Sequence, residues 1–192
     1  SVRTVYFDGL NNQDYLERKY KSPFQKRIRL RVYDPRDKNV KFEIKKKWTH
    51  SQVKDSIVIS REDAQEMLMG NFEVLKNYDD DTARLGYELC KAGGYRPVSM
   101  VEYKRRAYTH PQFSTRITMD SDLRYSDKDF NLFSLDAIDY RNVTDITSTI
   151  LEVKFERFLL PQIREVLANV DLKKCPFSKF GHSRALLEEY YY

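Results

Sequence analysis

Cysteine is scarce in this chain of 192 residues, which holds only Cys90 and Cys175. Two cysteines so far apart form neither a disulfide framework nor a zinc-binding motif, and they favour a reducing, cytoplasmic compartment. No uncharged apolar run approaches the roughly 20 residues that a membrane-spanning helix needs, and no signal-peptide pattern opens the sequence. We therefore expect no membrane segment in this chain.

Glycine and proline are also few, with six of each, and they fall mostly between periodic segments. Because no linker and no internal repeat is present, we expect a single domain over residues 1–192. The 14 tyrosines and 11 phenylalanines argue against disorder. The three histidines, His50, His110 and His182, are scattered without metal-ligand spacing. A net charge of +5 predicts an anionic partner without choosing among nucleic acid, a phosphate polymer and an acidic membrane.

Alternating apolar and polar residues predict an α+β fold dominated by antiparallel strands. The expected strands cover residues 3–7, 26–33, 40–48, 54–60, 99–108, 115–119 and 150–155. A polar, Asp-rich stretch is expected over 120–145. Helices are expected from Ser60, over 82–91, from Pro161, and over 183–189. Ser60 can cap its helix, and Gly93 with Gly94 is a typical helix end.

The polar faces of these strands carry an unusual amount of charge. Within strand 26–33, Arg27, Arg29 and Arg31 share one face, and Ile28, Leu30 and Val32 share the other. Four further strands carry charge in the same way, with these residues on their polar faces: Lys41, Glu43, Lys45 and Lys47; Arg116, Thr118 and Asp120; Glu152 and Lys154; and either Tyr103 with Arg105 or Glu102 with Lys104.

Any one of these faces alone is best explained as an ordinary solvated surface. Taken together, the faces are harder to explain as solvated surfaces, because arginines in one row repel one another and neighbouring cations add to the repulsion. A sheet rolled into a barrel, with charged faces inside and helices packed outside, accounts for both faces. The contents expected in such a bore are a polyanion and a divalent metal, since the arginine fork grips phosphate oxygens in pairs.

Seven short pieces, in this order, resemble the VTC domain: Val5-Tyr6-Phe7-Asp8; Arg29-Leu30-Arg31; Glu43-Ile44-Lys45; Tyr103-Lys104-Arg105-Arg106-Ala107-Tyr108; Arg116-Ile117-Thr118-Met119-Asp120; Leu151-Glu152-Val153-Lys154; and Phe177-Ser178-Lys179-Phe180. This is the catalytic domain of the vacuolar transporter chaperone polyphosphate polymerases, which belong to the triphosphate tunnel metalloenzymes.

The resemblance implies an antiparallel barrel tunnel that transfers the terminal phosphoryl group of ATP to inorganic polyphosphate, with Mn²⁺ or Mg²⁺ as cofactor. It implies no nucleic-acid partner and is compatible with a membrane-bound partner protein. Matched position by position, the catalytic residues are Arg29, Arg31, Lys45, Arg105, Arg116 and Lys179, and the metal ligand is Glu152. Lys179 rests on the resemblance alone. We add as substrate-binding residues Arg27, Glu43, Lys47, Tyr103 and Lys154.

The sequence also departs from the family pattern. Family members carry a further strand of Glu-x-Lys type and a helix before the first matched piece, and here the sequence opens at Ser1. That strand is cut off, disordered or truly missing, and only in the last case is the barrel expected to be open on one side. A tunnel-type triphosphatase acting on a nucleotide, RNA or inorganic triphosphate, and a non-catalytic polyphosphate- or nucleotide-binding module, stay open as alternatives. Lys104-Arg105-Arg106 is a weaker candidate for a nucleic-acid patch.

Overall fold

The computed structural model describes residues 1–49 and 51–191. One antiparallel sheet contains the eight strands β1 (Val2–Asp8), β2 (Phe24–Val32), β3 (Asn39–Trp48), β4 (Ser51–Ser60), β5 (Arg96–His110), β6 (Thr115–Ser126), β7 (Arg141–Asn142) and β8 (Ile150–Lys154). Their order is β4-β3-β2-β1-β5-β6-β7. The strand β8 also pairs with β6, at the end of β6 opposite to the one that pairs with β7. The predicted antiparallel α+β fold is confirmed.

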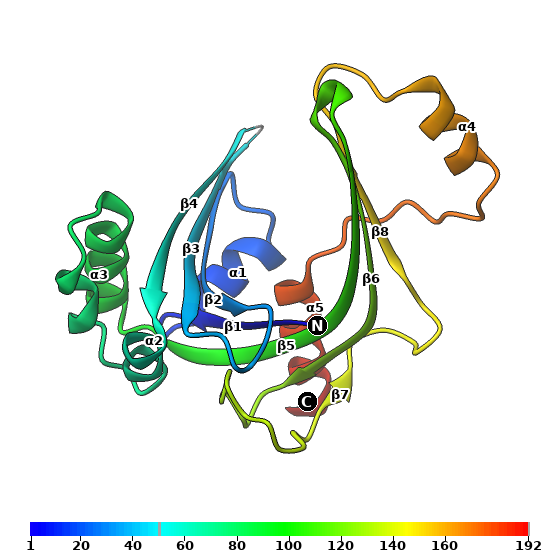
Figure 1. Cartoon of the computed structure of the whole chain (residues 1–192). Coiled ribbons are helices and arrows are strands. Elements are labelled where there is room, and N and C mark those ends of the chain that lie inside the picture. The colour runs from blue at the N-terminus through cyan, green and yellow to red at the C-terminus, as the bar shows by residue number, and fades with distance from the viewer. Residues whose placement is uncertain (50, 192) are drawn as a thin grey trace.

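The sheet bends into a trough (Figure 1). The strands β2, β3 and β4 form one wall, β1 and the start of β5 form the floor, and β6 with β8 forms the other wall. Within residues 1–49 and 51–191, β4 pairs only with β3 and β8 pairs only with β6. Closure into a barrel is therefore not confirmed, because the backbone ladder is open between β4 and β8.

The helical elements are α1 (Gln13–Lys19), α2 (Arg61–Leu68), η1 (Glu73–Asn77), α3 (Asp81–Gly93), η2 (Gln112–Ser114), α4 (Pro161–Ala168) and α5 (Lys179–Tyr191). The hydroxyl of Ser60 accepts the backbone N–H of Asp63 at 3.0 Å, which confirms the predicted start of α2. Gly94 ends α3 in the left-handed region, with φ of 58°. The structure differs from the prediction in several elements: α1 and β7 were not predicted, α5 begins earlier than residue 183, and β6 continues through residues 120–126.

The prediction that the helices pack outside is right for α2 and α3 and wrong for α1 and α5. On the convex face, α2 and α3 cover the apolar side chains of β2 and β3, including Ile28, Leu30 and Phe42. On the concave face, Tyr15 of α1 and Phe180 of α5 pack with Tyr6 of β1. One end of the concave face is apolar, so it needs a cover of its own, and these two helices supply it.

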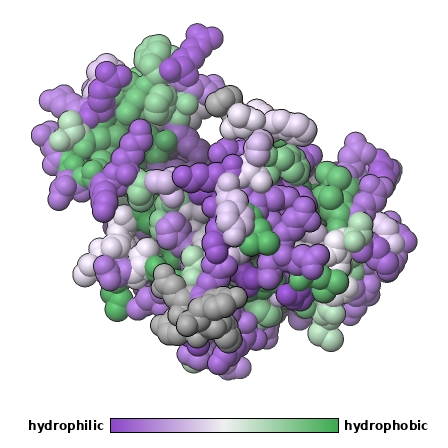
Figure 2. Space-filling model, turned by 180° about the vertical axis from the view of Figure 1, so that it is seen from behind, coloured by the Kyte–Doolittle hydropathy of each residue, from purple (hydrophilic) through white to green (hydrophobic). Residues whose placement is uncertain are grey.

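The segment that holds α4 stands away from the sheet in Figure 1. No residue of α4 is buried, and Val166, Val170 and Leu172 are exposed. Apolar side chains are visible on the corresponding lobe at the upper left of Figure 2. None of the helices within residues 1–49 and 51–191 is long and apolar enough to cross a membrane.

Gly86 marks the closest approach of α3 to the sheet. A Cβ atom at this position would lie 2.5 Å from Cε1 of Phe42, whose ring is fully buried. We therefore expect Gly86→Ala to lower the free energy of unfolding by roughly 1–3 kcal/mol, because overpacking outweighs the better helix propensity of alanine. Urea denaturation measures this.

Gly181→Ala is the matched control, since a Cβ there meets only ordinary contacts at 3.4 Å and beyond. We expect this variant, also on a helix, to be as stable as the parent or more so. Equal stabilities of the two variants would contradict the close approach.

Candidate functional site

A cavity of about 400 Å³ lies within the trough, and we call it the basic cavity. Every residue predicted for the site lines it except Lys47, which lines an adjoining hollow beside α1 and α5. The predicted residues brought together are Arg27, Arg29, Arg31, Glu43, Lys45, Tyr103, Arg105, Arg116, Glu152, Lys154 and Lys179. The lining also includes Lys41 and Thr118, which were predicted on the inward charged faces but not as site residues, and it includes residues without any such prediction: Tyr6, Tyr33, Gln52, Lys54, Phe177 and Ser178.

Glu43 organises the cations on the β2–β3–β4 wall. It stands opposite Arg29 in the strand pairing, is 2% exposed, and accepts a hydrogen bond from Nε of Arg29 at 2.7 Å. Arg31 and Lys54 approach its carboxylate oxygens at 3.8 and 3.5 Å. Burial raises the pKa of Glu43, but Arg29 and Arg31 lower it more, so the pKa falls below its usual value. Glu43 is therefore a counter-ion to these cations, and its contact with a substrate stays a prediction.

Asp120 has the same role on the opposite wall, and the sequence analysis did not single it out as a site residue. It is 1% exposed, and its two oxygens accept hydrogen bonds from Arg105 at 2.6 and 2.7 Å. The Nζ of Lys179 lies 2.6 Å from the same carboxylate. Burial raises the pKa of Asp120, and the bonds from Arg105 and Lys179 lower it below its usual value. The sequence signal was present, because Asp120 shares the polar face of Arg116 and Thr118.

These two carboxylates correct the interpretation that only a bound anion relieves the crowding of the arginines. Arg29 and Arg105 each have a buried carboxylate partner in the protein itself. These carboxylates hold the guanidinium groups in place before any ligand arrives, and they neutralise part of the positive charge of the cavity.

The orientation of β5 settles the alternative that the alternation left open. The β5–β6 register shifts between Glu102 and Lys104, and Tyr103 with Arg105 faces the basic cavity. Glu102 points away and pairs with Arg3 at 2.5 Å and with Arg124 at 3.1 Å. The assignment of Arg105 to the cavity is therefore right in placement.

The open edge of the cavity carries the more exposed residues. Arg116 and Thr118 of β6 stand opposite Lys154 and Glu152 of β8. The side chain of Glu152 is half exposed, and one of its oxygens lies 3.3 Å from Nζ of Lys154. The part of the chain that the structure describes contains no group of three or more His, Cys, Asp or Glu side chains placed to hold a metal. Glu152 therefore has no two further side chains of these types beside it, and His50 lies outside the described residues.

Lys45 lacks a carboxylate partner among the described residues, although it faces the cavity beside the arginines. Burial and the charges of Arg29, Arg27 and Arg31 lower the pKa of Lys45 to about 7. Burial raises the pKa of the nearby Tyr6 hydroxyl, but the cations around it lower that pKa below its ordinary value. The two shifts share one contribution, the positive charge of the neighbouring arginines, which a bound anion would offset.

The lowered pKa of Lys45 predicts that anion binding depends on pH. Below about pH 7 Lys45 already carries its proton, whereas above it binding must add one. We expect the affinity for inorganic tripolyphosphate, measured without metal, to fall as pH rises from about 7 to about 9, with uptake of about one proton per anion. Calorimetry in buffers of different ionisation enthalpy measures that uptake.

Lys45→Met is the control for this effect. It should bind tripolyphosphate more weakly and with a flatter pH dependence. A pH dependence that is identical in parent and variant would exclude Lys45 as the group that titrates.

Comparisons with known proteins bear on the family and the fold. The family model described as VTC domain matches residues 1–188. A crystal structure of a putative adenylate cyclase from Bacillus halodurans is similar, with a TM-score of 0.53 and 12% identity over 92% of this chain and 78% of that chain. The search of curated proteins found no match. At this identity the structure shows a shared fold alone, whereas the family match covers nearly the whole chain. The chain therefore belongs to the VTC domain family.

Proposed function

We propose that this VTC-domain chain is a polyphosphate polymerase, which transfers the terminal phosphoryl group of ATP to a growing inorganic polyphosphate chain and releases ADP. The observation that carries the proposal is the convergence of cations from five strands and α5 on the basic cavity: Arg29 and Arg31 of β2, Lys45 of β3, Arg105 of β5, Arg116 of β6, Lys154 of β8 and Lys179 of α5. Such a lining suits an anion with many charges in a row, as a chain of phosphates is.

Phosphoryl transfer demands positioning and charge stabilisation more than covalent chemistry from the protein. Arg29 and Arg105 stand on opposite walls, and each is held by a buried carboxylate. Their remaining N–H groups would bind oxygens on the two sides of the reacting phosphates, already oriented before the substrate arrives. Lys45 and Lys179 would add point charges along the same path.

Glu152 is the carboxylate that would hold Mn²⁺ or Mg²⁺. Its oxygens are hard donors, its side chain is half exposed, and its partner Lys154 lies at 3.3 Å rather than in a tight bond. A single carboxylate fits an ion that keeps several waters and takes its other ligands from phosphates. When bound, such an ion neutralises charge on the phosphate oxygens.

The acceptor phosphate itself would act as the nucleophile. Glu43 lines the cavity, and Asp120 contacts its lining residues Arg105 and Lys179. Both carboxylates are engaged by cations and have lowered pKa values, so neither suits a general base that activates water. This favours transfer to a phosphate over hydrolysis, the reaction of a tunnel-type triphosphatase.

Incubation with ATP and Mn²⁺ tests the proposal. A polymer of phosphate together with ADP supports it. Free phosphate without polymer would mean a triphosphatase, and tight binding without either product would mean a binding module.

The Glu152→Gln variant tests the metal site. We expect metal-dependent turnover to fall by a factor of about 100 or more, since the amide cannot hold the cation, while nucleotide affinity without metal changes little. Glu156→Gln, just beyond β8 and outside the cavity lining, is the control and should keep parental activity. Undiminished turnover of Glu152→Gln at limiting Mn²⁺ would remove Glu152 as the ligand.

The Arg116→Met variant tests the cavity as the phosphate site. Arg116 is exposed and has no carboxylate partner among the described residues, so its loss should leave the free energy of unfolding nearly unchanged. Losing a charge-assisted contact should weaken tripolyphosphate binding roughly tenfold or more. Arg106→Met, on the neighbouring strand but outside the cavity lining, should bind normally. Equal affinities in the two variants would argue against the site.

A further inference from the structure

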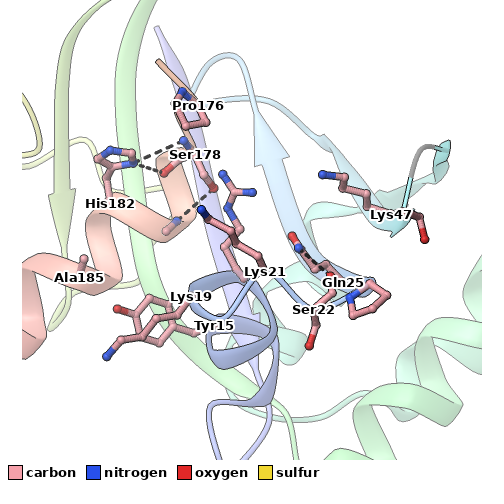
Figure 3. Close-up of a pocket in the computed structure, with 14 residues that line it drawn as sticks. Tyr15, Lys19, Lys21, Ser22, Gln25, Lys47, Pro176, Ser178, His182 and Ala185 are labelled. Carbon is pink, nitrogen blue, oxygen red and sulfur yellow. Dashed lines mark hydrogen bonds between the residues drawn. The ribbon is translucent and has the colours of Figure 1, made fainter. Parts of the chain in front are cut away.

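A second hollow of about 680 Å³ adjoins the basic cavity, and we call it the end groove (Figure 3). It lies between α1, the start of β2, the end of β3 and the start of α5. Ser178 lines both hollows. Gln25 and Lys47 of the groove are also the next same-face residues along β2 and β3 after Arg27 and Lys45 of the cavity, about 7 Å further on. The two hollows are therefore neighbours along the same strands.

Gln25 is the feature of the end groove that the fold leaves unexplained. It is 5% exposed, and its Nε2 donates to the carbonyl oxygen of Ser22 at 3.0 Å. Because a carbonyl only accepts, that bond identifies which end of the amide is nitrogen. The other end, Oε1, is buried and has no hydrogen-bond partner. Figure 3 shows the Gln25 amide between Lys21 and Lys47.

The unpaired Oε1 indicates which chemistry the groove can satisfy. A buried acceptor without a donor costs free energy, which a ligand recovers if it brings an N–H group. A chain of ionised phosphates has no donor to offer. The exocyclic amino group of a base has one.

The remaining walls suit a planar organic ring. Tyr15, Pro23, Pro176 and Ala185 present carbon surfaces to the groove. Lys21 and Lys47 also line the groove and have no ion-pair partner within the described residues. A mostly apolar pocket with a few placed polar groups is the usual form of a site for an organic ligand.

We propose that the end groove binds the base of a nucleoside triphosphate whose phosphates lie in the basic cavity, with Oε1 of Gln25 accepting the exocyclic amino group of adenine. This rests on the proposed function for its choice of a nucleotide. It makes Gln25 a specificity residue that separates ATP from inorganic triphosphate and from nucleotides without that amino group.

Binding of three probes without metal tests the groove: ATP, inosine triphosphate and inorganic tripolyphosphate. Inosine triphosphate carries the same phosphates but has a carbonyl in place of the amino group. We expect the parent protein to bind ATP about three- to tenfold more tightly than inosine triphosphate, the worth of one hydrogen bond. In Gln25→Met the two nucleotides should bind equally, with tripolyphosphate affinity unchanged.

Ala185→Phe keeps the test decisive if Gln25→Met does not fold. Ala185 is half-buried on α5, so a larger side chain there fills the groove and not the cavity. ATP binding should weaken while tripolyphosphate binding stays the same.

Two results would overturn the proposal. One is equal affinity of the parent for ATP and inosine triphosphate. The other is an Ala185→Phe variant that loses affinity for long-chain polyphosphate but not for ATP, because the groove would then hold phosphate chain. Absent tripolyphosphate binding in the parent would refute the proposed function instead, and the ratio of the two nucleotide affinities would still decide the groove.

Discussion

Two buried carboxylates, Glu43 and Asp120, hold the positive charges of this molecule in a common interior. Each lies on one wall of the trough and is engaged by an arginine within 2.7 Å and by a further cation. Without them, the guanidinium groups of Arg29 and Arg105 would be buried and mutually repelling, which costs several kcal/mol per ion. The charged interior is therefore stable in the absence of a ligand and remains short of negative charge.

The remaining excess of positive charge explains why this fold suits anion binding. Lys45 shows it most directly, because it is a half-buried lysine whose pKa is lowered to about 7 by burial and by the arginines around it. An anion that enters the cavity meets donors that are already oriented, so binding loses little to reorganisation. The convex face contributes indirectly: α2 and α3 bury its aliphatic side chains, and the opposite side chains of the same strands can then be charged.

Strand alternation was enough to predict most of the cavity. Arg27, Arg29 and Arg31 alternate with Ile28, Leu30 and Val32, and the structure places the two sets on opposite faces. What alternation cannot give is where a face ends, so Lys47 was assigned to the cavity although it lies one residue pair beyond it. Strand alternation also could not predict the bulge in β5 or whether the sheet closes, because both depend on pairing between distant strands.

Two further features were missed because they depend on contacts between residues that are apart in the sequence: the start of α1 and the role of Asp120. The helix α1 starts where the Asp8 carboxylate accepts the N–H groups of Asp14 and Tyr15, six and seven residues along the chain, so no local capping motif is visible. Asp120 was seen only as one polar residue of a strand, because its partner Lys179 comes much later in the sequence.

A crystal structure of the protein with inorganic tripolyphosphate and Mn²⁺ tests the central claim most directly. The account predicts phosphate groups between Arg29 and Arg105, with the anomalous signal of manganese next to Glu152. Phosphate bound on the outer surface, with the basic cavity unchanged, would contradict it.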